Sequence, residues 1–298
     1  MLTLSSRKPS PFEAFRFGTV GSPLSTPKKP GGSVGAILRL RELELDALEL
    51  GWVHGVRVTE TTCADIRTAA SEKDVALSVH APYFINVNGD EAEWPKSRKR
   101  LMDAAYWGNR AGATDFVFHP GSYFGRPPQV VLPIVIERLA GCLEELQAAG
   151  NSVTLRPEMM GKSAMLGSLE DTLAIGRALP GVEPCLDFAH LHARPGDGTM
   201  NTYDEWRGVL EAYGNALGEI ALHRLHVHLS GIKYSAKGER EHLTFEKADL
   251  NLEDILRALS DFGCAGRILC ESPIMEDDAQ LIREKWGQIS GDVSPRST

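Results

Sequence analysis

Residues 226–243, HVHLSGIKYSAKGEREHL, carry three histidines and two glutamates in one short segment. Imidazole nitrogens and carboxylate oxygens are the usual ligands of zinc and related transition metals in proteins. Arg240, two residues before His242, is an unexpected cation in such a set. Whether these residues bind metal depends on the elements that position them.

Short segments with β-strand character alternate with longer amphipathic segments along the chain. We predict strands within residues 14–21, 45–53, 75–83, 114–122, 152–159, 182–190, 224–231 and 267–273. Between them lie helix signals, such as Ser168 with Asp171 as a capping pattern, and Asn251 before an apolar pattern that ends at Gly263. Eight such units predict a single-domain (β/α)8 TIM barrel over about residues 15–290, with short loose ends. A doubly wound open sheet is the weaker alternative, because no G-x-G-x-x-G motif follows the first strand.

Histidines and carboxylates are concentrated at the ends of the predicted strands, where barrels of this type carry their active sites. They are His80, His119, Glu158, Asp187, His190, His228 and Glu271, and His242 follows in a loop. Taken singly, each has a structural explanation as a hydrogen-bonded histidine, a salt-bridge partner or a turn cap. Only 9 of the 298 residues are histidine, yet most later strand ends carry one, so the set together predicts a metal site. We expect His54, His192, His223 and His226 to be structural or surface residues.

Oxygen and imidazole ligands without thiolate suit Zn²⁺, Mn²⁺ or Fe²⁺, and the number of histidines favours zinc. The candidates outnumber the ligands of one ion, so more than one ion is expected. Closely spaced ions lower the pKa of bound water toward about 7 and stabilise both oxygens of a phosphodiester during hydrolysis. Metal-assisted hydrolysis is therefore the predicted reaction class, and no G-x-S-x-G, P-loop or H-E-x-x-H motif competes with it.

The composition, with 42% hydrophobic and 24% charged residues, is that of a folded protein without an apolar run of membrane-spanning length. The N-terminal segment lacks the apolar core of a signal peptide, so we expect a cytoplasmic protein with no membrane partner. Five cysteines without a C-x-x-C pair predict reduced, mostly buried thiols. The net charge of −8 argues against broad nonspecific binding to nucleic acid but leaves room for a local basic surface.

From about residue 15 to residue 290, the chain resembles the endonuclease IV family of zinc-dependent apurinic/apyrimidinic endonucleases, within the xylose isomerase-like barrel superfamily. The resemblance rests on HAPYFINV, FHPGSY, the glutamate of LRPEMMGKS, LDFAH, HLSG with the following EHL, and ILCESP. It implies a first zinc on His80, His119 and Glu158, a second on Glu158, Asp187, His228 and Glu271, and a third on His190 and His242. The implied activity hydrolyses duplex DNA 5′ to an abasic site, leaving a 3′-hydroxyl, in base excision repair. We expect two or three zinc ions per chain and a monomer.

Sugar isomerases and epimerases of the same superfamily are the main alternative. They use a single metal on a Glu, Asp, His and Glu set, which Glu158, Asp187, His228 and Glu271 would satisfy. They generally lack the additional histidines at positions 80, 119, 190 and 242, which therefore favour the endonuclease. A non-catalytic barrel that binds damaged DNA or a sugar is a third possibility.

Two further features bear on DNA. Tyr83 and Phe84 match the position where endonuclease IV proteins insert side chains into the duplex, although aromatic residues there could equally be core residues. Basic residues in PKSRKR (residues 95–100), with Lys28 and Lys29, could contact phosphates or form a solvated helix start.

Arg240 departs from the bacterial family pattern, in which an aspartate two residues before the loop histidine completes the third zinc site. Residues two apart in an extended segment share a face, so we expect Arg240 and not Glu241 beside His242, with Glu239 reaching only if the loop turns. Three outcomes are open: a glutamate ligand, which we favour; a weak or empty third site; or Arg240 bound to the scissile phosphate. The GERxHL pattern resembles archaeal-type members, and EMMGKS brings Lys162 near the site.

Overall fold

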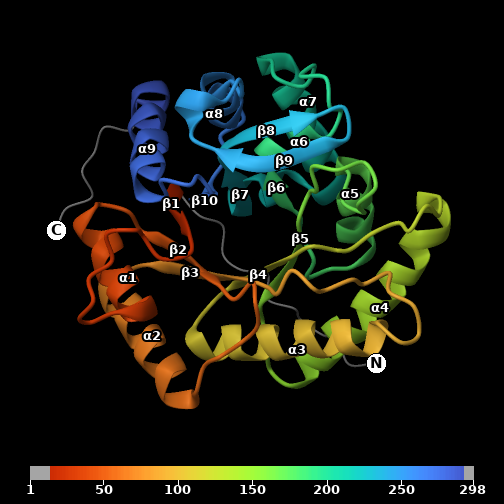
Figure 1. Cartoon of the computed structure of the whole chain (residues 1–298), viewed down its shortest axis with the longest axis horizontal. Helices are drawn as coiled ribbons and strands as arrows, with labels where there is room; N and C mark the ends of the chain where they lie inside the picture. Colours follow the sequence, from red (N-terminus) through yellow and green to blue (C-terminus); the bar gives the residue numbers. More distant parts are fainter. Residues whose placement is uncertain (1–13, 292–298) are drawn as a thin grey trace.

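Eight parallel strands form one curved sheet surrounded by helices in the computed structural model, which describes residues 14–291 (Figure 1). All eight match the predicted positions: β1 Phe15–Val20, β2 Ala47–Gly51, β3 Ala76–His80, β4 Asp115–Phe118, β5 Thr154–Pro157, β6 Cys185–Asp187, β7 Leu225–Leu229 and β10 Gly266–Cys270. The predicted (β/α)8 barrel is therefore confirmed. The loose ends predicted at the two termini fall almost entirely outside the described residues.

Hydrogen bonds between β5 and β6 bring the two ends of the sheet together. The sheet order is β5-β4-β3-β2-β1-β10-β7-β6, so β5 and β6 are its edges. Isolated parallel bridges join Leu155 to Val182 and Glu158 to Cys185. Within the described chain, these two edges form no continuous ladder. The barrel is nearly closed, and this closure brings Glu158 beside the strand that carries Asp187.

The helices that follow the strands include the two whose first residues the sequence predicted. They are α1 Gly32–Glu42, α2 Glu60–Lys73, α3 Trp94–Ala111, α4 Pro128–Ala148, α5 Leu169–Ala178, α6 Phe188–Ala193, α7 Tyr203–Leu217, α8 Leu252–Asp261 and α9 Glu276–Ser290, with 3-10 turns η1 Glu219–Arg224 and η2 Phe245–Lys247. Ser168 and Asp171 form a capping box at α5, and the Asn251 side chain accepts a hydrogen bond from Asp254 N at α8. Across residues 14–291, no helix has the length and apolar character needed to cross a membrane.

A hairpin between β7 and α8 was not predicted. Its strands are β8 Gly231–Ser235 and β9 Gly238–Leu243, and they pair antiparallel to each other, outside the barrel sheet. Figure 1 shows the hairpin lying close to α6, beyond the ends of β6 and β7. The segment after the seventh barrel strand is therefore a defined structure that brings His242 back toward the strand ends.

Successive side chains of a strand point to opposite faces of the sheet, so each barrel strand has one row of side chains facing inward and one facing outward. In β7, Leu225, Val227 and Leu229 belong to the hydrophobic core, whereas His226 and His228 form the other row and face Glu49 of β2. The interior of this barrel is thus polar, and polar groups taken out of water need partners.

At the N-terminal end of the barrel, the interior is filled by ion pairs. The carboxylate of Asp115 lies 2.6 Å from Arg156 Nε and 2.8 Å from Arg267 Nη2, and all three side chains are buried. Burial tends to raise the pKa of Asp115, but Arg267 and Arg156 outweigh it and lower that pKa well below its usual value. Asp115 and Arg267 lie at the starts of β4 and β10, whereas the candidate ligands lie at the ends of the strands.

We expect Asp115→Asn to lower the free energy of unfolding by about 3–5 kcal/mol, because it leaves two buried guanidinium groups without their shared carboxylate. The lowered pKa means that the ion pairs stabilise the fold fully above the unfolded-state pKa of about 4 and that this contribution is lost as the pH falls below it. Urea unfolding at pH 7 and at lower pH measures both effects. A loss under 1 kcal/mol at pH 7, or a variant as acid-sensitive as the wild type, would contradict this account.

Candidate metal centre

Two groups of candidate ligands meet at the C-terminal ends of the strands and share Glu158. One group is His80, His119 and Glu158, and the other is Glu158, Asp187, His228 and Glu271; within each, the ligand atoms lie within 4.8 Å of one another. Oε2 of Glu158 is 3.3 Å from His80 Nε2 and 3.1 Å from His119 Nε2, whereas its Oε1 is 3.4 Å from His228 Nδ1. The two oxygens of Glu158 therefore face different groups, as a carboxylate shared by two cations would require.

Each of three candidate histidines is held by one ring nitrogen and directs the other toward the carboxylates. Nδ1 of His80 bonds to Ala81 O at 3.0 Å, Nδ1 of His190 to Met159 O at 2.8 Å, and Nδ1 of His242 to Ser230 Oγ at 2.6 Å. Metal-ligating histidines characteristically use their second nitrogen in this way, which fixes the orientation of the ring. The loops that follow the strands thus orient the imidazoles before any ion binds.

Several polar atoms at the centre have no hydrogen-bond partner, although they are fully buried. They are both carboxylate oxygens of Glu158, Oδ2 of Asp187, and Nδ1 of His228. The two oxygens of Asp187 differ: Oδ1 accepts the His190 backbone N–H at 2.7 Å and caps α6, whereas Oδ2 lies 3.1 Å from His190 Nδ1 and has no hydrogen-bond partner. Buried polar atoms without partners are rare and costly, and a divalent cation would satisfy these atoms together.

The electrostatics of the centre also favour a cation. Burial opposes charge on Glu158, but His119, His190 and His228 face it and hold its pKa well below the usual value. Burial, with the neighbouring carboxylates of Glu271 and Glu158, raises the pKa of Asp187 to about 8. In the metal-free cluster Asp187 therefore holds its proton more tightly than an ordinary carboxyl group, because it is buried beside other carboxylates. Binding of a metal would displace that proton.

A third set of side chains lies between α6 and the hairpin. Oε2 of Glu239 is 3.3 Å from His190 Nε2, and the His190 and His242 rings have centroids 5.6 Å apart. Nε2 of His242 is 3.9 Å from Glu271 Oε2. The third set therefore adjoins the second group, with Glu239 at the position where the sequence analysis sought an acidic ligand.

A β-bulge explains why Glu239 reaches His190, and it corrects the expectation that Arg240 shares a face with His242. Ile232 pairs with His242, but the register shifts after Lys233, so Tyr234 pairs with Glu239 instead of Arg240. Cross-strand partners share a face, so the extra residue puts Glu239 on the face of His242. The prediction for Arg240 assumed a regular strand without a bulge, and that assumption was wrong.

The other charged residues of this segment take different positions. Arg240 is exposed. Glu241 is also exposed and forms an ion pair with Lys233 at 2.9 Å, so it points away from His190. Lys162 lies 3.4 Å from the other oxygen of Glu239, at the edge of the centre. Of the three charged residues before His242, only Glu239 contacts the candidate ligands within the described structure.

Tyr83 and Phe84 lie on the loop after β3 and are 50% and 62% exposed, so they are not core aromatics. The Tyr83 ring stacks on His119 with centroids 5.2 Å apart and contacts His80 edge-on. Arg100 donates to the Phe84 carbonyl at 2.9 Å and fixes the loop. An exposed aromatic pair is therefore held directly beside the first group of candidate ligands.

The basic cluster of residues 95–100 is the first turns of α3, and its charges are matched locally. Lys96 and Arg100 pair with Glu93, Arg98 pairs with Glu145, and Lys99 pairs with Asp103. This cluster is a salt-bridged helix start, the second of the two explanations considered above. Lys28 and Lys29, in the loop before α1, are exposed.

Two residues of the centre were missed by the sequence analysis. Glu49 of β2 is completely buried and contacts both His226 and His228. Cys185 lies with His226 and His228 in a further group of ligand-type side chains, although it is a free buried thiol like the other four cysteines. A glutamate inside the apolar segment LDALELGWV was the available signal for Glu49. The free, buried state of all five cysteines agrees with the predicted reduced thiols.

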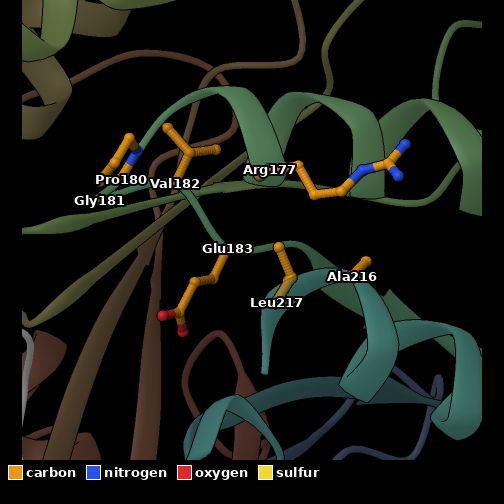
Figure 2. A pocket seen from close by; sticks show the side chains of 8 residues that line it. Arg177, Pro180, Gly181, Val182, Glu183, Ala216 and Leu217 are labelled. Carbon is orange, nitrogen blue, oxygen red and sulfur yellow. The ribbon is translucent and has the colours of Figure 1, made fainter. Parts of the chain in front are cut away.

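A pocket of about 160 Å³ lies away from this centre, between the end of α5, the start of β6 and the end of α7 (Figure 2). Its charged lining residues are Arg177 and Glu183. The Glu183 carboxylate already accepts a hydrogen bond from Arg224 at 2.7 Å and lies 3.3 Å from Arg156. The one carboxylate of this pocket is therefore already paired, and none of the candidate ligands lines it.

A (β/α)8 barrel whose strand ends converge on a metal-type ligand cluster defines the class of this protein. A sequence model of the xylose isomerase-like TIM barrel family matches residues 37–287, and the chain belongs to that family. An uncharacterized protein of Methanocaldococcus jannaschii is 36% identical over 274 residues, which cover 92% of this chain and 97% of that protein. A protein named probable endonuclease 4 from Oceanobacillus iheyensis is 28% identical over 172 residues, so the chain spans about half (55%) of the length of that relative.

Two solved structures share the fold. Endonuclease IV from Thermus thermophilus has a TM-score of 0.68 and 21% identity, covering 92% of this chain and 99% of that chain. A D-tagatose 3-epimerase-like protein has a TM-score of 0.67 and 18% identity, covering 88% and 98%. At these identities the likeness establishes the architecture and does not distinguish between the two activities.

The position of Glu239 leads to a prediction with a matched control. Glu239→Gln should lower the affinity for a metal held beside His190, because an amide is a poorer ligand than a carboxylate, while Glu241→Gln should bind metal like the wild type. Gly161→Ala should act like Glu239→Gln, since a Cβ there would come within 2.4 Å of Glu239 Oε2. Equilibrium dialysis with element analysis measures bound metal per chain. Equal binding by Glu239→Gln and wild type, or weaker binding by Glu241→Gln, would refute this assignment.

Proposed function

We propose that this protein is a zinc-dependent endonuclease that hydrolyses the DNA phosphodiester 5′ to abasic sites. The observation that carries the proposal is the pair of ligand groups that share Glu158, one of which contains His80 and His119. A ligand set for one ion would not need these two histidines. The names of the endonuclease 4 relatives, which match over part of their length, support the same reading.

The donor set suits zinc, because histidine nitrogens and carboxylate oxygens dominate it, and Mn²⁺ and Fe²⁺ accept the same ligands. His80, His119 and Glu158 would hold one ion; Glu158, Asp187, His228 and Glu271 a second; and His190, His242 and Glu239 a third. When bound, such ions lower the pKa of water toward about 7 and stabilise charge on the attacking and leaving oxygens of a phosphodiester.

The chain's own residues supply orientation and proton transfer. Glu158 is almost fully buried and is suited to hold the two groups at a fixed separation. Glu271 has a side chain that is 13% exposed, compared with 1% for Glu158, so water has better access to it; besides holding the second ion, it would accept the proton of the attacking water. Arg240, exposed on the hairpin next to Glu239, would bind a substrate phosphate through its guanidinium group. Lys162 adds a second cation at the same edge.

Recognition of a lesion would fall to the loop after β3. Tyr83 and Phe84 project beside the first ligand group, where they could fill the space left by a missing or extruded base. A sugar isomerase or epimerase is the second candidate function, because Glu158, Asp187, His228 and Glu271 alone form a complete set for one ion. The isomerase account leaves His80, His119 and the exposed aromatic pair without a role.

Incision of a duplex oligonucleotide with one synthetic abasic site tests the proposal. The zinc-loaded wild type should cut 5′ to the lesion, chelator should abolish cutting, and Glu271→Gln should cut about 10²–10⁴-fold more slowly because a carboxylate that acts as metal ligand and proton acceptor is lost. Glu241→Gln, an exposed residue away from the ligands, should cut like the wild type. Absence of cutting by the metal-loaded wild type, or equal cutting by Glu271→Gln, would reject the endonuclease.

The aromatic pair gives a separate prediction. Replacing both Tyr83 and Phe84 by alanine should weaken binding to the abasic duplex by about 1–3 kcal/mol, since stacking against the bases is lost. Fluorescence anisotropy with abasic and intact duplexes measures this change, and metal content should be unaltered. Tyr106→Ala, an exposed aromatic on α3, serves as the control. Unchanged binding by the double variant would exclude a role for these side chains in lesion recognition.

A further inference from the structure

Glu49 is a buried carboxylate that the proposed reaction does not use. It lies on β2, and its side chain is completely buried inside the barrel. Its Oε2 accepts hydrogen bonds from Ser78 Oγ at 2.7 Å and from His226 Nε2 at 2.8 Å. Its Oε1 is 3.1 Å from His228 Nε2. Burying a carboxylate inside the barrel costs free energy, so a buried carboxylate with several dedicated partners is expected to have a specific role.

The surroundings of His228 indicate that task. Nε2 of His228 faces Glu49, whereas Nδ1 is 3.4 Å from Glu158 Oε1 and 3.6 Å from Glu271 Oε2. His228 thus stands between a carboxylate behind it and two candidate ligands in front of it. His80, His190 and His242 are instead held by a carbonyl or a hydroxyl group. Nε2 of His228 has no such hydrogen-bond partner, and the group nearest to it on that side is the Glu49 carboxylate, at ion-pair distance.

The contacts of Glu49 determine which ring nitrogen of His228 carries the proton. Ser78 and His226 donate to one oxygen of Glu49, so the carboxylate is held in place and presents its other oxygen to His228. The negative charge of this fixed carboxylate, 3.1 Å away, favours a proton on Nε2, which leaves the lone pair of Nδ1 for a cation. The pairing of β2 with β3 sets this arrangement, since Glu49 and Ser78 are register partners.

We propose that Glu49 is a positioning residue for the metal centre: it holds His228 in the orientation and tautomer that present Nδ1 to the metal, with Ser78 and His226 holding Glu49. The inference rests on the proposed metal-binding function of the same cluster. It gives the buried pair Glu49 and His226 a function, although neither would touch the ion.

A rival assignment would make Cys185, His226 and His228 a separate metal site, because their ligand atoms lie within 4.8 Å of one another. Two observations oppose it. Nε2 of His226 is already hydrogen-bonded to Glu49, and His228 turns its Nδ1 toward Glu158 and Glu271. A neutral imidazole offers one lone pair, so His228 cannot serve both sites.

Metal affinity of Glu49→Gln tests the inference, because glutamine keeps the shape of the side chain but removes the charge. Competition with a chromophoric chelator should show Co²⁺ and Zn²⁺ dissociation constants raised about 10–100-fold relative to the wild type, and the Co²⁺ absorption spectrum should change. Asp115→Asn, an equally buried carboxylate at the opposite end of the barrel, should lose stability and keep wild-type affinity. Cys185→Ser should also keep wild-type affinity.

The outcomes separate this inference from the proposed function. Wild-type affinity in a folded Glu49→Gln would overturn the positioning role while leaving the metal centre intact, and so would a loss of affinity in Cys185→Ser. Failure of the wild type to bind metal would reject the proposed function itself. If Glu49→Gln does not fold, Ser78→Ala provides the test: a smaller but measurable loss of affinity supports the role, and unchanged affinity overturns it.

Discussion

Buried negative charge at the C-terminal end of the barrel is the constraint on which the site depends. Glu49, Glu158 and Asp187 are at most 1% exposed, and Glu271 is close beside them. The histidines that face these carboxylates offset the negative charge only when they are protonated. Even with these histidines nearby, burial and the neighbouring carboxylates raise the pKa of Asp187 to about 8. Such a cluster is costly in a folded protein unless a cation completes it. In the described structure, this free-energy cost of incompletely paired buried carboxylates falls on the C-terminal end of the barrel.

The opposite end of the barrel shows how the same problem is solved without a metal. Asp115 is also buried, but Arg156 and Arg267 pair with it directly. A guanidinium group compensates a carboxylate permanently, whereas the imidazoles at the strand ends leave lone pairs and oxygens free for an ion. The barrel therefore separates a permanently neutralised end, which supports the fold, from an end whose neutralisation is left to a ligand.

Much of this arrangement could be predicted from the sequence. Strand and helix periodicity placed all eight barrel strands, and the strand ends then converged in space because parallel strands in a barrel share one C-terminal face. The two ligand groups that meet at Glu158 contain the residues expected from those strand ends. Regular alternation is a local property, which is why these predictions needed no tertiary information.

The parts that could not be predicted depend on departures from regularity or on contacts between distant segments. A β-bulge in β9 moves Glu239 onto the face of His242, and nothing in GEREHL distinguishes a bulge from a plain strand. Glu49 is separated from His226 by 177 residues, so its role emerges only when β2 and β7 face each other across the barrel. Both cases concern the residues that support or complete the ligand set.

The central claim is that the two groups meeting at Glu158 bind metal ions. Anomalous diffraction from crystals grown with Zn²⁺, recorded on both sides of the zinc absorption edge, tests it most directly. The account predicts separate peaks among His80, His119 and Glu158 and among Glu158, Asp187, His228 and Glu271. A single peak in the second group would fit the one-metal isomerase instead, and the absence of any peak at Glu158 would contradict the account.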